Sequence, residues 1–208
     1  MILVSKYCVM RRHTLIEDGK LIFESNPDLK YSEFLSAVYR NLQLQYPKFF
    51  KMDELSKTGF LAAEVLLSGH TDNRNLQNEN MPVYMICRSS SLETDENFEL
   101  TTGAEYFPSP SVFVYTLPNI VLGEIAIKNK LYGENTCFVC EDFANEIVFD
   151  YICQGVRSAC PNEALVLFID QYHGVGEVLA VLISEQRNEN DGITGFTIEH
   201  INELLNKH

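Results

Sequence analysis

The sequence has no apolar run long enough to span a membrane. A membrane helix needs about 20 predominantly apolar residues, whereas the longest apolar runs here have the length of a β-strand. The apolar residues 1–4 are followed by Lys6, Arg11 and Arg12, and a secretory signal carries its positive charge before its apolar stretch. We therefore expect a cytoplasmic protein without a membrane partner.

Basic residues are scarce. The 208 residues include 16 Lys and Arg against 29 Asp and Glu, so the formal net charge is −13. A surface of this sign repels phosphate backbones and anionic lipids. The 10 Tyr and 13 Phe are interleaved with acidic rather than basic residues, which argues against stacking on single-stranded nucleic acid. We expect no nucleic-acid partner.

Nucleotide and metal motifs are also missing. No P-loop, G-x-S-x-G elbow or H-E-x-x-H is present, and residues 174–176 lack the third glycine of a dinucleotide fingerprint. Of the six cysteines, only Cys137 and Cys140 have the C-x-x-C spacing, with no second pair and no histidine nearby. Their alternating context predicts a strand that turns the two thiols apart, and a metal or redox pair is the alternative. We expect no metal and no cofactor.

The composition that remains is typical of a globular protein, with 46% hydrophobic and 22% charged residues. The length suits a single domain over residues 1–208 with a sizeable core. Strand patterns at 2–10, 21–23, 83–87, 137–140, 164–169 and 178–184 alternate with helix patterns at 32–45, 53–67, 118–130 and after Asp142. Residues 69–80 and 89–103 predict loops, and 112–116 predicts an extended segment. This alternation predicts an α/β fold, with a mixed sheet covered by helices.

Four segments share a pattern with one known family. They are the helix at 50–64 (FKMDELSKTGFLAAE), the stretch from Pro108 to Ile127, the turn at 130–136 (KLYGENT), and the strand pair at 164–169 and 176–183. In order and spacing, these segments resemble the N-terminal half of a β-ketoacyl-acyl-carrier-protein synthase, of the thiolase-like superfamily. The resemblance implies a thiolase-like half: a mixed five-stranded sheet with a buried central helix and covering helices.

The resemblance also implies a nucleophilic cysteine at the N-terminus of that central helix, where the helix dipole and backbone N–H groups favour a thiolate. Counted from Gly133, the family position falls on Asp142, and a two-residue gap would bring Cys140 into it. There, Glu141 and Asp142 would raise the pKa of the thiol. Two interpretations stay open: Cys140 is the nucleophile, or it is a buried strand cysteine and Asp142 is the N-cap of the helix.

The histidines are a second departure from the family pattern. The resemblance implies two catalytic histidines from a C-terminal half that this sequence does not include. The histidines present are at 13, 70, 173, 200 and 208, and none matches a family histidine motif. His173 follows a predicted strand end, where functional residues often lie, so it is the candidate base. The alternative is a solvated loop histidine.

Three functions are compatible with these residues. We predict the first, a non-catalytic ketosynthase-like subunit in fatty-acid, polyketide or polyene-pigment assembly. It would form a homodimer or a heterodimer with a ketosynthase, because a lone half exposes an apolar face. The second is an active 3-oxoacyl-acyl-carrier-protein synthase or acyltransferase that uses Cys140, with an acyl-carrier protein as partner. The third is a small-molecule-binding or scaffold protein that kept only the fold.

Overall fold

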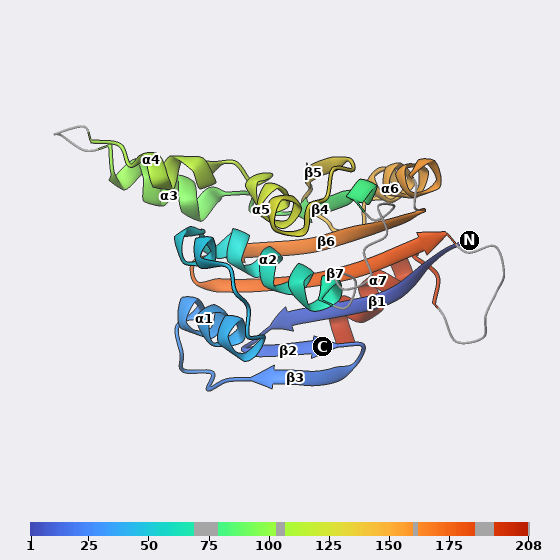
Figure 1. Cartoon of the computed structure of the whole chain (residues 1–208), viewed down its shortest axis with the longest axis horizontal. Coiled ribbons are helices and arrows are strands. Elements are labelled where there is room, and N and C mark those ends of the chain that lie inside the picture. The colour runs from blue at the N-terminus through green and yellow to red at the C-terminus, as the bar shows by residue number, and fades with distance from the viewer. Residues whose placement is uncertain (69–78, 103–106, 160–161, 186–193, 208) are drawn as a thin grey trace.

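The computed structural model describes residues 1–68, 79–102, 107–159, 162–185 and 194–207. Most of the predicted loop at 69–80 lies outside these residues. Within them, one mixed sheet of seven strands runs in the order β3-β2-β1-β7-β6-β4-β5 (Figure 1). The strands are β1 (Ile2–Arg11), β2 (Thr14–Glu17), β3 (Lys20–Glu24), β4 (Val83–Cys87), β5 (Asn135–Val139), β6 (Glu163–Tyr172) and β7 (Val175–Glu185).

The sheet is larger than the five strands that the resemblance implied. β4 runs parallel to β5 and β6, and the other neighbouring strands are antiparallel. β2 and β3 extend the sheet beyond β1 as two consecutive hairpins. β3 contains the predicted strand at 21–23. β2 has no counterpart in the sequence-based prediction, because four residues are too few to show a clear alternation.

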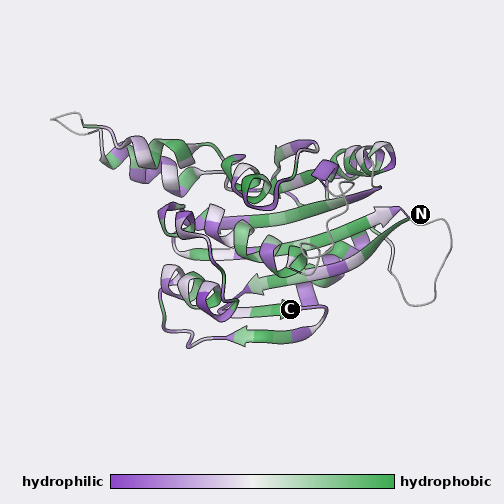
Figure 2. Cartoon of the chain, viewed as in Figure 1, coloured by the Kyte–Doolittle hydropathy of each residue, from purple (hydrophilic) through white to green (hydrophobic). Residues whose placement is uncertain are grey.

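Helices cover both faces of the sheet. They are α1 (Tyr31–Asn41), η1 (Pro47–Lys51), α2 (Glu54–Leu67), α3 (Leu92–Leu100), α4 (Pro110–Phe113), η3 (Val114–Thr116), α5 (Ile120–Asn129), α6 (Glu146–Ser158) and α7 (Ile198–Lys207). One core cluster joins α1, α2 and α5 to one face, and a second joins α6 and α7 to the other. Figure 2 shows the apolar stretches of β6 and β7 between these layers. No single helix of the described residues is long and apolar enough to cross a membrane.

The most completely buried long helix is α2, rather than the helix that follows Asp142. α2 is buried at 12 of its 14 positions, and Asp53 caps it as predicted by accepting the N–H of Ser56. A Cβ on Gly59 would lie 2.5 Å from Cγ1 of Val121 on α5, so the two helices approach closely at this small residue. α6 buries four of its 13 residues and keeps an open face.

Two segments without an apolar period are helical, contrary to the prediction. The predicted loop at 89–103 contains α3, and the predicted extended segment at 112–116 falls in α4 and η3. α3 (LETDENFEL) buries only Thr94, so no apolar stripe marks it as a helix in the sequence. Figure 1 shows α3 and α4 together as an arm that projects from the sheet.

Three strand connections are two-residue turns with both residues at positive φ. The turns at 18–19 and 173–174 each end in glycine, at φ 79° and 70°, and glycine adopts this conformation without strain. The turn between β1 and β2 instead holds Arg12 at φ 47° and His13 at φ 63°. A left-handed conformation costs a residue with a Cβ about 1 kcal/mol or more, so this turn is strained.

Replacing Arg12 and His13 by Asn and Gly is therefore expected to raise the free energy of unfolding by about 1–2 kcal/mol. Urea unfolding of the two proteins measures the difference. Asp18→Asn in the next hairpin is the matched control and should change stability little. A lower midpoint for the Asn-Gly variant would show that the two side chains stabilise the hairpin more than the strain destabilises it.

Candidate functional site

Polar side chains from five neighbouring strands form one row across the sheet, which we call the polar row. It consists of Cys140, Arg88, Asp170, Glu177 and Arg11, in the strand order β5, β4, β6, β7 and β1. Cys140 and Arg88 each follow the last registered pair of β5 and β4, and Asp170 pairs with Glu177. Arg11 is one position beyond the last registered pair of β1 and β7. Strand alternation places all five on the face that α6 and α7 cover.

Arg88 links the middle of the polar row. Its guanidinium carbon lies 3.9 Å from the ring centroid of Phe143, and its Nη1 is 3.2 Å from Oε1 of Glu177. Asp170 accepts the backbone N–H of Ser89 at 2.8 Å. The side chains of Arg88 and Glu177 are 41% and 34% exposed. The pair therefore contributes less than about 1 kcal/mol to stability.

Cys140 lies directly after β5 and packs against the core cluster of α6 and α7. Its backbone N–H donates to the carbonyl oxygen of Cys87 at 2.9 Å. Burial raises the pKa of its thiol, and the neighbouring Cys137 raises it further. Cys137 packs against the opposite cluster, so the strand prediction is confirmed and the two thiols lie on opposite faces. Within the described residues, no group of three His, Cys, Asp or Glu side chains is placed to hold a metal.

Asp142 is not the N-cap of α6, so that prediction is wrong. Its Oδ1 accepts the N–H of Ala144 two residues later, and α6 starts at Glu146. The N-cap is Asn145, whose Oδ1 accepts the N–H of Val148. The helix starts later than predicted because the ring of Phe143 is buried against the sheet, at 1% exposure, before the helix begins.

His173 occupies the turn between β6 and β7 and is 65% exposed. Its Nε2 is 3.4 Å from Oε2 of Glu96 on α3, and its ring packs edge-on against Tyr172. His173 therefore contacts α3 and its own hairpin. In the described part of the chain, Cys140 forms no hydrogen bond or ion pair with a histidine.

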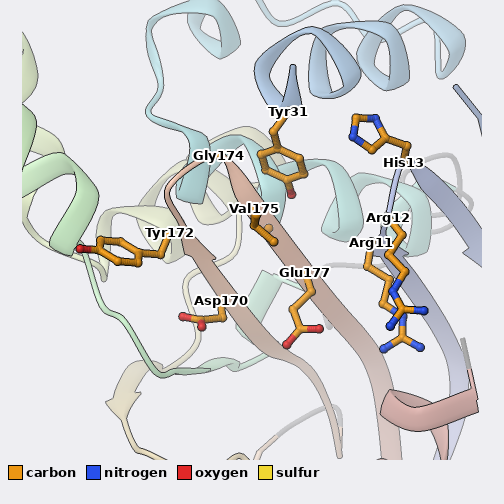
Figure 3. A pocket seen from close by; sticks show the side chains of 10 residues that line it. Arg11, Arg12, His13, Tyr31, Asp170, Tyr172, Gly174, Val175 and Glu177 are labelled. Atoms are coloured by element: carbon orange, nitrogen blue, oxygen red, sulfur yellow. The ribbon is translucent and has the colours of Figure 1, made fainter. Parts of the chain in front are cut away.

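A cleft of about 380 Å³ opens at the Arg11 end of the polar row (Figure 3). It lies between the β1–β2 turn, the start of α1 and the β6–β7 hairpin. Its lining includes Arg11, Arg12, His13, Tyr31, Asp170 and Glu177. Sequence reasoning missed this cleft. The available signal was the run of three basic residues at 11–13 in an acidic chain.

The polar row offers charges and hydrogen bonds, and the pKa of its thiol is raised rather than lowered. A thiolate needs a nearby cation, a base or a helix N-terminus. Arg88, the cation of the row next to Cys140, is engaged by Glu177. α6 begins six residues after Cys140, with Phe143 buried between them. The dipole of α6 is strongest within its own first turn, so it does little for this thiol.

Comparison with known proteins identifies the fold. No family model and no curated protein matches the sequence. The ishigamide ketosynthase/chain length factor superposes with a TM-score of 0.64 at 16% identity, over 91% of this chain and 63% of that one. A ketosynthase in complex with its chain length factor from Xenorhabdus doucetiae superposes with a TM-score of 0.60 at 12% identity, over 89% of this chain and 79% of that one. The chain thus spans less than two thirds of the first of these structures.

These similarities agree with the α/β architecture and with the motifs recognised in the sequence. Identities of 16% and 12% establish the fold alone. The chain therefore shares the fold of part of these ketosynthase and chain-length-factor structures.

Proposed function

We propose that this chain is a non-catalytic ketosynthase-like subunit that pairs with a ketosynthase in fatty-acid, polyketide or polyene-pigment assembly. The observation that carries the proposal is the raised pKa of the Cys140 thiol, which is caused first by burial and then by Cys137. A cysteine that attacks a thioester must instead be held as a thiolate by a cation or a base.

The neighbouring groups of the polar row support the same interpretation. Decarboxylative condensation develops negative charge on an oxygen, which a catalyst stabilises with free donors aimed at that position. The row contributes Asp170 and Glu177, and the guanidinium of Arg88 already pairs with Glu177. His173 reaches Glu96 instead. These groups therefore suit a structural role better than they suit acyl transfer.

An apolar surface at the edge of the sheet supports pairing. β5 is the last strand of the sheet, and its Val139 is 57% exposed. On the adjacent helix α6, Ile147 is 80% and Tyr151 is 44% exposed. An exposed edge strand beside apolar side chains is a surface that proteins normally cover. We propose a ketosynthase subunit as its partner, because the similar structures are a ketosynthase/chain length factor and a ketosynthase in complex with its chain length factor.

Incubation with acyl-carrier-protein thioesters is expected to leave Cys140 unmodified, as read by intact-protein mass spectrometry. Iodoacetamide should alkylate Cys140 more slowly than free cysteine at pH 7, and the rate should still be rising as the pH passes the ordinary thiol pKa of 9.0. The raised pKa keeps the thiol protonated at neutral pH. Cys140→Ala identifies the signal of this residue, and Cys153→Ala, at another half-buried cysteine, is the matched control.

An acyl adduct that disappears in Cys140→Ala would overturn the non-catalytic proposal. It would favour an active synthase that takes its base from another chain. If no adduct forms, Ile147→Lys tests the pairing. This exposed substitution should leave the fold intact and abolish co-elution with the ketosynthase, whereas co-elution that is unchanged would rule out this surface.

A further inference from the structure

Two arginine side chains of consecutive residues line the cleft. Figure 3 shows the side chains of Arg11 and Arg12 close together at the cleft. Neither forms an ion pair with the described residues, although acidic residues outnumber basic ones by 29 to 16. Burial and then the charge of Arg12 lower the pKa of Arg11, while the charge of Glu177 raises it, so Glu177 attracts Arg11 and the two cations repel each other. An anion bound between them would remove this repulsion.

The fold fixes Arg11 in place. Its Nη1 donates to the carbonyl oxygen of Leu205 at 2.6 Å, in the last turn of α7, where the helix dipole favours a cation. Its Nε is buried and makes no hydrogen bond within the described residues. A buried donor without an acceptor is unfavourable. The hydrogen bond to α7 therefore anchors the guanidinium at the cleft.

Arg12 is presented by the strained turn. Both Arg12 and His13 are left-handed, at φ 47° and 63°, although Asn-Gly would make the same turn without strain. His13 is anchored by its Nδ1, 3.3 Å from Oγ of Ser25, and by ring packing against Phe34 at 5.1 Å. Strain of this kind persists where the surrounding structure holds it, often at ligand-binding positions. The turn thus places a second guanidinium beside Arg11.

The acidic side chains of the cleft are already engaged. Glu177 pairs with Arg88 at 3.2 Å, and Asp170 accepts the N–H of Ser89 at 2.8 Å. Together with Arg88, the arginines Arg11 and Arg12 carry one positive charge more than Asp170 and Glu177 carry negative charges. Two guanidinium forks match the oxygens of a phosphate, which can accept from both, whereas a carboxylate is satisfied by one.

We propose that this cleft binds the phosphate group of a small phosphomonoester, with Arg11 and Arg12 as its direct ligands. The volume of about 380 Å³ accommodates such a molecule. The walls beyond the phosphate carry Tyr31 and the two engaged carboxylates, which suit an uncharged, hydroxyl-bearing remainder. This site is independent of the proposed pairing with a ketosynthase, and either proposal can fail alone.

Isothermal titration of the full chain with glycerol 3-phosphate tests the proposal, at physiological ionic strength because salt screens the long-range repulsion between the acidic chain and an anion. We expect saturable binding, weakened at least tenfold by Arg12→Gln and at least tenfold weaker for acetate. Lys20→Gln removes one exposed cation from the next hairpin and is the matched control, with an expected change below twofold. The Asn-Gly variant of residues 12 and 13 should fold more stably and still lose binding.

Several outcomes would overturn the proposal. The absence of saturable binding of glycerol 3-phosphate would do so. Equal weakening by Lys20→Gln would show attraction by overall charge alone, and acetate binding of equal strength would exclude selection for a phosphate. Inorganic phosphate is titrated in parallel. Binding of phosphate without glycerol 3-phosphate would show an ion site and overturn the phosphomonoester.

Discussion

Replacing Gly155 by alanine is expected to destabilise the protein by about 2–3 kcal/mol. A Cβ at this position on α6 would lie 2.0 Å from the hydroxyl oxygen of Tyr84 and 3.0 Å from its Cζ. Tyr84 is fully buried in β4, and its hydroxyl donates to Oε2 of Glu134 at 3.0 Å. Neither the ring nor the helix can shift without losing this hydrogen bond or the packing around it.

The magnitude follows from opposing effects. Alanine is favoured over glycine within a helix by about 1 kcal/mol. Overpacking a core costs about 1–3 kcal/mol, and a buried hydroxyl that loses its acceptor costs about 1–3 kcal/mol more. The steric effect therefore outweighs helix propensity at Gly155.

Gly123 is the matched control for this substitution. It also lies within a helix, α5, and a Cβ there would meet nothing within 4 Å. Gly123→Ala should stabilise the protein by up to about 1 kcal/mol. Denaturant unfolding of both variants measures the contrast. A Gly155→Ala protein as stable as the original would contradict the close packing of α6 on Tyr84, and Tyr84→Phe should recover part of the loss.

Replacing Lys48 by methionine is expected to cost about 2–3 kcal/mol of stability. The carboxylate of Glu124 on α5 is 2% exposed, and Nζ of Lys48 lies 2.9 Å from its Oε1. The hydroxyl groups of Tyr115 and Tyr46 donate to the same carboxylate at 3.2 and 3.5 Å. Removing the lysine leaves a buried charge with two neutral donors only.

Breaking a fully buried ion pair costs about 3–5 kcal/mol. Lys48 is 46% exposed, and the two tyrosine donors remain in the variant, so the expected loss is smaller. The double variant Lys48→Met with Glu124→Gln should recover much of it, because glutamine keeps an acceptor for the tyrosines without a charge. Lys51→Met, at an exposed lysine of the same 3-10 helix, is the control. Equal losses for the two lysine variants would refute the role of the Glu124 charge.

The sequence predicted features that depend on local chemistry. The buried strands β4, β6 and β7 follow from runs of β-branched and apolar residues, and the N-cap Asp53 and the turn at 18–19 follow from residue types with one strong local preference. The family motifs predicted a ketosynthase-like fold, and ketosynthase and chain-length-factor structures superpose on the chain. These signals lie within about ten residues of one another, so one sequence suffices to detect them.

Other features were decided only when the chain folded. The start of α6 moved to Glu146 because Phe143 is buried against the sheet, a contact that no local pattern encodes. β2 became a strand by pairing with β1, and α3 is helical without an apolar stripe.

The polar row and the cleft depend most strongly on tertiary structure. Arg11 and Glu177 come from opposite ends of the chain and share the polar row only through the register of β1 and β7. The arginine pair lines a cleft only in the folded chain, because α1, α7 and the β6–β7 hairpin surround it. The sequence shows which residues are charged. The distances between these charges depend on strand register, which is set by pairings between residues far apart along the chain.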